Sequence, residues 1–192
     1  MSQPPEGSTP VTPMWHRVVG SRGLQLLAGF VLLGWALGQW LEAAGGAEAW
    51  GERLGVLGPV FLVPAQSLAA FTPLLGEVIA VANAALYGFW GGSSISFAAW
   101  LLAAWVQYGI ARRTARDFDF DATHARLPTW MQRFPIDHPL FLIGVRLPLG
   151  GPIVNTAAGA FGVSLWRHTW CAAIGIAPRA MFFSALASGL PG

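Results

Sequence analysis

Long apolar runs separated by short polar stretches dominate the pattern of the chain. Residues 24–41 form a run of eighteen residues without a charge, which is about the length of a helix that crosses a bilayer. The apolar core of a signal peptide is shorter, about 7–15 residues, so we predict a spanning helix here. Residues 93–111 form a second uncharged run, of nineteen residues. Residues 168–189 form a third apolar helix, which contains Pro178 and Arg179.

Two further apolar segments are interrupted by proline and glycine. Residues 59–90 hold one charge in thirty-two residues, and a straight helix of this length would measure about 48 Å, against about 30 Å of hydrocarbon. Residues 139–166 also hold one charge. Irregular backbone is tolerated at membrane depth where it lines a cavity or is covered by protein, so we predict two re-entrant helical hairpins. We assign these residues to the breaks: Pro73, Gly76, Pro148, Gly150, Gly151 and Pro152.

The distribution of arginine predicts the orientation of these segments. Cytoplasmic loops are enriched in Lys and Arg. With a cytoplasmic N-terminus, the first hairpin enters from outside and the second from the cytoplasm, so the two halves have opposite orientations. Only Arg53 is then outside, and the inside positions are Arg17, Arg22, Arg112, Arg113, Arg116, Arg126, Arg133 and Arg167.

The predicted fold class is therefore all-α. It is a polytopic membrane protein with two inverted repeats, each a re-entrant helical hairpin plus a transmembrane helix. The proline-, serine- and glycine-rich start of the chain predicts a flexible cytoplasmic tail over residues 1–23. Residues 24–192 form a single membrane domain.

The composition agrees with a membrane location. Charged residues make up 10% of the chain, against about 25% in an average soluble domain. All eleven basic residues are arginine, which excludes P-loop and Schiff-base lysines. The net charge of +2, without a dense basic run on a polar face, argues against nucleic-acid binding. The sequence contains no nucleophile–base motif and no metal-ligand spacing, so we predict no enzyme, no metal and no cofactor.

Three charged residues remain inside the apolar segments: Glu77, Arg146 and Arg179. A charge at the bilayer centre costs about 2.5–3.5 kcal/mol on insertion scales, so each should face a cavity or a partner. Glu77 is either a protonation switch coupled to substrate movement or a structural carboxylate. Arg146 either binds a lipid phosphate with two parallel hydrogen bonds or forms an ion pair with Glu77. Arg179 either satisfies a backbone carbonyl freed by Pro178 or makes a second phosphate contact.

Three further polar residues complete the candidate site. Arg112, beside Arg113, is mainly a determinant of topology and can also guide anionic headgroups at the cytoplasmic surface. Asn83 and Asn155 lie in the two hairpins. We expect their amides to bond exposed hairpin backbone, and direct contact with substrate is the alternative.

Several ordered motifs resemble the DedA/VTT-domain (SNARE-associated) superfamily of membrane proteins, in particular its TVP38-like branch. The first half shows Thr-Pro-Leu-Leu-Gly-Glu at 72–77 and Asn-Ala-Ala-Leu-Tyr-Gly at 83–88. The second half shows Arg-Leu-Pro at 146–148, Asn155 followed by Ala-Gly at 158–159, and Gly-Ile-Ala-Pro at 175–178. Two features depart from the family pattern: Leu75 stands where a second proline is common, and the second hairpin lacks an acidic residue.

The resemblance implies two hairpins that face each other across the bilayer, and it implies lipid translocation. The best expectation is a flippase for an isoprenoid (undecaprenyl) phosphate carrier, with membrane lipids as partners and possible proton coupling. The alternatives are an energy-independent phospholipid scramblase, a small-ion or solute transporter, and a membrane structural or assembly factor. We further expect a multi-pass protein of the cell membrane, with the bacterial inner membrane as the preferred location. A homo-oligomer is a possible state.

Overall fold

The chain folds into helices that lie lengthwise along one another. The computed structural model describes residues 20–46, 49, 53, 55–72, 74–118, 135–146 and 150–189. Every regular element in these ranges is helical: α2 (Arg22–Ala43), η1 (Gly55–Leu57), α4 (Gly58–Ala69), α5 (Leu75–Asp117), α8 (Pro139–Gly144), α10 (Gly151–Ala160) and α11 (Leu165–Ser188). Three of the helices, α2, α5 and α11, are long and apolar enough to cross a membrane. The predicted all-α membrane class is thereby confirmed.

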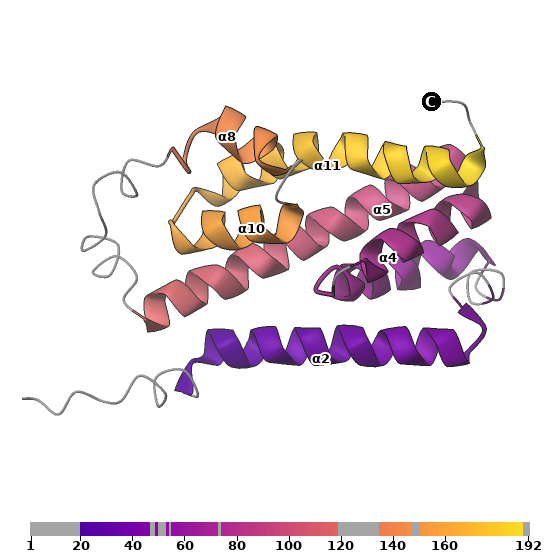
Figure 1. The fold of residues 1–192 in the computed structure, drawn as a ribbon, viewed down its shortest axis with the longest axis horizontal. Helices are drawn as coiled ribbons and strands as arrows, with labels where there is room; N and C mark the ends of the chain where they lie inside the picture. Colours follow the sequence, from indigo (N-terminus) through magenta and orange to yellow (C-terminus); the bar gives the residue numbers. More distant parts are fainter. Residues whose placement is uncertain are drawn as a thin grey trace, which may run out of the picture.

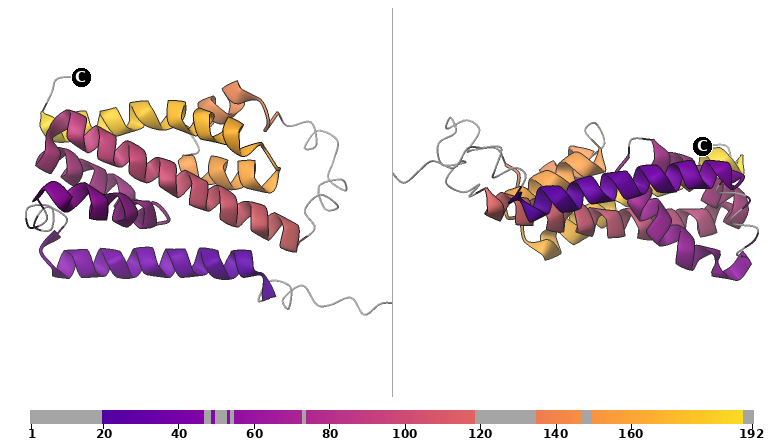
Figure 2. Two further views of the ribbon diagram at one scale, coloured as in Figure 1. Left: turned by 180° about the vertical axis from the view of Figure 1, so that it is seen from behind. Right: turned by 90° about the horizontal axis from the view of Figure 1, so that it is seen from below.

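Two short helices lie between the long ones. Figure 1 shows α2, most of α5 and α11 running along the molecule, with α10 toward one end and α4 toward the other, and Figure 2 shows the same arrangement from behind. With 12 and 10 residues, α4 and α10 are about 18 and 15 Å long, too short to cross about 30 Å of hydrocarbon. Their lengths and positions agree with re-entrant segments, and the inverted symmetry of the two halves stays a prediction.

The first hairpin consists of α4 and the beginning of α5. The two arms are antiparallel, because Tyr87 reaches the start of α4 and donates a hydrogen bond to the Gly55 carbonyl over 3.1 Å. A Cβ on Gly58 would lie 1.7 Å from the Tyr87 hydroxyl oxygen, so any larger residue there would displace the tyrosine ring. The turn between the arms ends at Leu74, whose φ of 67° is in the left-handed region. Gly76, which we assigned to the break, lies in the first turn of α5.

A kink at Gly88 joins this hairpin to the long spanning part of α5. Gly88 has φ 70° and ψ 178°, a non-helical conformation inside the 43 residues of α5. We predicted a hairpin up to residue 90 and a span over 93–111, but the helix resumes directly after Gly88 and continues to Asp117. One glycine therefore makes the reversal between the first hairpin and the following span. The helix therefore includes residues 112–117, which lie beyond the predicted end of the span.

The second hairpin is built differently from the first. Its break ends at Gly150, which has φ 80°, and Pro152 lies in the first turn of α10, where its missing N–H costs no helical hydrogen bond. Helix α10 packs against α5, whereas α8 packs against α11. Helix α11 starts at Leu165, because the Ser164 hydroxyl accepts a hydrogen bond from the Arg167 amide, three residues before the predicted start.

The core is made largely of small residues. One buried cluster joins α5 to α11 through Trp100 and Ile176 with several alanines, and a second joins α5, α8, α10 and α11 around Tyr108, Leu142 and Cys171. Small side chains let helix backbones approach closely, which drives helix association in membranes. Of the predicted tail, Ser21 is buried and Arg22 and Gly23 belong to α2, while residues 1–19 lie outside the described part.

Candidate functional site

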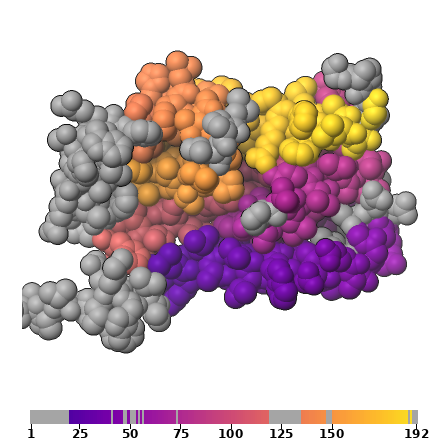
Figure 3. Space-filling model, viewed as in Figure 1, coloured from indigo at the N-terminus to yellow at the C-terminus, as the bar shows by residue number. Residues whose placement is uncertain are grey.

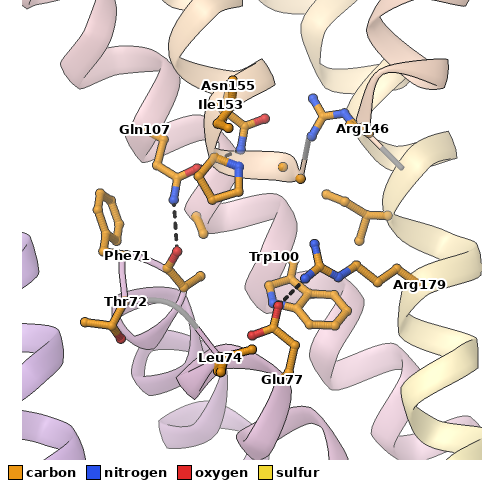
Figure 4. A pocket seen from close by; sticks show the side chains of 16 residues that line it. Phe71, Thr72, Leu74, Glu77, Trp100, Gln107, Arg146, Ile153, Asn155 and Arg179 are labelled. Atoms are coloured by element: carbon orange, nitrogen blue, oxygen red, sulfur yellow. Dashed lines mark hydrogen bonds and ion pairs between the residues drawn. The ribbon is translucent and has the colours of Figure 1, made fainter. Parts of the chain in front are cut away.

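A cavity of about 420 Å³ lies where the two hairpin breaks face each other. Its walls come from the first break, the middle of α5, the second break with the start of α10, and α11. Figure 4 shows polar side chains from all of these elements around it. Four of the six predicted polar residues line this cavity: Glu77, Arg146, Asn155 and Arg179. Residues far apart in the sequence thus form one site.

Glu77 and Arg179 form an ion pair on one side of the cavity. Glu77 lies in the first turn of α5, and the Arg179 guanidinium also lies over the Trp100 ring, 5.1 Å from its centroid. The ion pair joins the first hairpin to α11. In this conformation Glu77 therefore pairs with Arg179 and not with Arg146, the partner that we had considered. The pair also engages the Arg179 guanidinium, which we expected to satisfy a backbone carbonyl near Pro178.

Arg146 is a buried cation for which the described residues supply no counterion. The residue is 5% exposed, and its three guanidinium nitrogens have no hydrogen-bond partner within the described part of the chain. It follows α8 and lies beside the second break (Figure 4). Unpaired buried charges are strongly unfavourable, so this guanidinium needs a counterion that the described part of the chain does not supply.

Two glycines make room for the Arg146 side chain. A Cβ on Gly175 of α11 would lie 2.6 Å from Cδ of Arg146, so the arginine stem passes over this glycine. A Cβ on Gly151 would lie 3.7 Å from a terminal nitrogen of Arg146 and 3.8 Å from the Asn155 amide nitrogen. The guanidinium and Asn155 are therefore neighbours at the start of α10, and no side chain from position 151 separates them.

A chain of amides connects the two hairpins across the cavity. The Asn155 amide donates to Oε1 of Gln107 over 2.8 Å. The Gln107 amide donates in turn to the Ala70 carbonyl over 3.3 Å, at the end of the first arm. We expected Asn155 to bond backbone directly, but a glutamine of the long span carries the link. The relative position of the two breaks thus depends on Gln107.

A matching pair of amides lies inside the first hairpin. The fully buried Asn83 donates to Oε1 of Gln66 over 2.8 Å, and Gln66 donates to the Gly76 carbonyl over 3.1 Å. Asn83 does not line the cavity. Asn83 thus holds the two arms together, as the structural expectation has it, but it bonds a glutamine side chain and not the backbone directly.

The remaining predicted residues have separate positions. Arg112 lies near the end of α5, and a Cβ on Gly162 would be 2.6 Å from its guanidinium, so it covers the turn between α10 and α11, away from the cavity. Gly150, Gly151 and Pro152 line the cavity at the second break. Gly76 is buried beside Trp100. Pro73 and Pro148 lie outside the described residues.

Three residues of the site and the first hairpin were not predicted from the sequence: Gln107, Gln66 and Trp100. Gln107 is the one amide in the predicted span over residues 93–111, and buried amides in apolar helices need partners, so this position carried a usable signal. Trp100 stood among ten tryptophans, and nothing in the sequence distinguished it from the others.

The cavity is lined by charged and amide side chains. It brings two arginines, one carboxylate and two amides to the same space. Over the ranges that the structure describes, no three His, Cys, Asp or Glu side chains gather where they could hold a metal ion. If the Glu77–Arg179 pair is counted as neutral, Arg146 leaves the site with an unbalanced positive charge.

We expect Gln107→Leu to lower the stability of the protein. The substitution removes both hydrogen bonds of the amide and leaves the Asn155 amide and the Ala70 carbonyl without these partners. Each unsatisfied buried group costs about 1–3 kcal/mol. Thermal unfolding in detergent measures the effect, with Gln39→Leu as control, since Gln39 is exposed on α2. Equal unfolding temperatures of the two variants would contradict the proposed link.

These features define a polytopic helical membrane protein with a cavity, lined by two arginines and a glutamate, between two hairpin breaks. The family model of the VTT domain matches residues 72–188, from the turn of the first hairpin to the end of α11. The chain belongs to this family, the domain family of the DedA and SNARE-associated proteins, as the motifs at the two breaks indicated. No curated protein and no solved structure matches the chain.

Proposed function

We propose that the protein moves a lipid with an anionic phosphate headgroup across the bilayer, and that the headgroup binds in the cavity between the hairpin breaks. The observation that carries the proposal is the buried guanidinium of Arg146, which has no hydrogen-bond partner in the described ranges of the chain. A phosphate oxygen pair fits the planar fork of arginine with two parallel hydrogen bonds. A bound phosphate would supply the missing counterion.

The ion pair of Glu77 with Arg179 gives the site two states, one with the pair formed and one with the pair broken. When Glu77 takes up a proton from the aqueous side, its carboxylate becomes neutral and its attraction to Arg179 falls. Arg179 is then available to the phosphate together with Arg146. Loss of the proton on the other side restores the pair, which withdraws one of the two cations and favours release.

The preferred substrate is an isoprenoid phosphate carrier, and a phospholipid presents related headgroup chemistry. The presence of a titratable ion pair in the cavity favours proton-coupled movement over energy-independent scrambling. The two are separated by reconstituting the protein in vesicles and following labelled polyprenyl phosphate and labelled phosphatidylglycerol, with and without a pH gradient. Gradient-dependent flux of the polyprenyl phosphate is expected. Gradient-independent flux of both lipids would favour a scramblase, and no flux of either would overturn the proposal.

We expect Glu77→Gln to remove the response of flux to the pH gradient. The amide cannot take up or release the proton, while it can still accept a hydrogen bond from Arg179, so folding should be preserved. The ratio of the flux with a gradient to the flux without one should fall to about one. Glu42→Gln, at an exposed position of α2, is the control and should keep the wild-type ratio. A wild-type ratio in Glu77→Gln would remove the switch.

A further inference from the structure

A second cavity lies outside the hairpins, along the outer helix α2. Its volume is about 450 Å³, and it is lined by Arg22, Gln25, Leu26, Gly29, Phe30, Leu33 and Arg113. All but Arg113 belong to α2, and Arg113 comes from the far end of α5. Figure 3 shows α2 as a ridge along the edge of the molecule. We call this cavity the α2 groove.

Glycines on α2 show where the helix contacts the rest of the protein and where it does not. A Cβ on Gly23 would lie 2.0 Å from the Thr114 hydroxyl, and one on Gly34 would lie 2.8 Å from the Leu68 carbonyl. Both positions therefore require glycine for close packing. Gly29, between them, has nothing within 4 Å of the corresponding point. The helix is thus held on both sides of a stretch that the described part of the chain leaves uncovered.

The two ends of the α2 groove differ in character. The start of α2 is fixed to the end of α5, because the Asp117 carboxylate accepts hydrogen bonds from the Ser21 hydroxyl over 2.9 Å and the Gly23 amide over 3.3 Å. Arg22 and Arg113 lie at this end. Toward the other end the lining is apolar, and Phe30 stacks on Phe71 with a centroid separation of 4.9 Å.

The charges at the polar end match those of a phosphodiester. Both arginines are exposed, and neither forms an ion pair with any residue that the structure describes. The two guanidinium groups and the nearby Asp117 carboxylate sum to one positive charge. A phosphodiester carries one negative charge, and arginines at the end of a spanning helix attract anionic lipid headgroups.

The length of the α2 groove matches one leaflet. The helix rises about 16 Å between Arg22 and Leu33 at 1.5 Å per residue, and half of the hydrocarbon core measures about 15 Å. An acyl chain that starts at the arginines would lie over Leu26, Gly29 and Leu33. The first and third of these are exposed, at 47% and 58%.

We propose that the α2 groove binds one anionic glycerophospholipid, with its phosphate at Arg22 and Arg113 and one acyl chain along Gly29. This lipid is a resident of the leaflet at the start of α2, bound apart from the cavity between the hairpins. It fills the uncovered stretch between α2 and α5 and joins the outer helix to the domain.

Native mass spectrometry of the full chain from mixed micelles tests this proposal. The wild type should retain phosphatidylglycerol in preference to phosphatidylcholine. Arg22→Gln combined with Arg113→Gln should weaken phosphatidylglycerol binding about tenfold, since each arginine near the headgroup contributes a several-fold effect. Gly29→Leu should also weaken it by filling the path of the acyl chain. Arg116→Gln is the matched control, because Arg116 is exposed on the same end of α5 and does not line the α2 groove.

Three outcomes would overturn the proposal. The first is equal binding in the double variant and in Arg116→Gln. The second is loss of phosphatidylglycerol binding in Arg146→Ala but not in the double variant, which would place the bound lipid between the hairpins. The third is a change from dimer to monomer in Gly29→Leu with unchanged lipid binding, which would make the α2 groove an interface between copies. Thermal unfolding of each variant shows whether its fold is intact.

Discussion

Arg146→Met is expected to abolish lipid translocation without lowering the stability of the protein. Methionine has a similar length and no charge, and replacement of a buried ion by a packed apolar side chain is often neutral or stabilising. Arg146 has no hydrogen-bond partner among the residues that the structure describes, so little should be lost in the empty protein. Two charge-assisted hydrogen bonds to phosphate are worth about 1.5–3 kcal/mol each, which predicts at least about a hundredfold loss of flux.

Initial flux in proteoliposomes, normalised to incorporated protein, and thermal unfolding in detergent measure the two effects. Arg146→Lys is the companion variant. It keeps the positive charge and loses the planar fork, so its flux should lie between those of Arg146→Met and the wild type. A methionine variant that unfolds well below the wild type would show that the guanidinium stabilises the fold, and wild-type flux in both variants would remove its role in headgroup binding.

Gly159→Ala is expected to separate α10 from α5. A Cβ at this position would lie 2.4 Å from the Tyr108 carbonyl oxygen, 3.0 Å from the Ala111 Cβ and 3.1 Å from the Arg112 amide nitrogen. Two of these atoms are backbone, so the clash is relieved only by moving a helix. Overpacking of this kind costs about 1–3 kcal/mol. Asn155 lies one turn earlier on α10, so its hydrogen bond to Gln107 and the flux should be lost as well.

Gly109→Ala is the matched control for this prediction. Gly109 is likewise a glycine inside a helix, in this case α5, and a Cβ there would meet nothing within 4 Å. Alanine has the higher helix propensity, which predicts a gain of about 0.5–1 kcal/mol. Opposite shifts in unfolding temperature are therefore expected for the two glycines, and shifts of the same sign and size would refute the close packing at Gly159.

The apolar runs predicted the long helices well because a membrane span must satisfy its backbone internally and present apolar side chains. The pattern located α2 and α11 to within a few residues, and it placed breaks before Glu77 and after Arg146. It erred at the end of the first hairpin, where Gly88 alone reverses the chain. The sequence offers several glycines in that region, Gly88, Gly91 and Gly92, and only the packing of the arms selects one of them.

The site was predicted in part. The rarity of charge in apolar segments identified Glu77, Arg146 and Arg179 as residues that face a cavity, because an isolated charge cannot face lipid at low cost. Their pairing could not be predicted, since either arginine could reach the carboxylate. The glutamines that link the hairpins were missed because the energetic importance of an amide depends on its burial and its partners.

The sequence by itself determined that this chain is an all-α membrane protein. It also determined which charges lie inside the apolar segments and roughly where the two hairpins break. These properties follow from local composition and from the cost of placing polar groups in hydrocarbon. Only the tertiary structure decided that Glu77 pairs with Arg179 and that Arg146 has no hydrogen-bond partner among the described residues. The partner of a charge is set by the helices packed around it. The same packing brings the two hairpin breaks to one cavity, which no local pattern encodes.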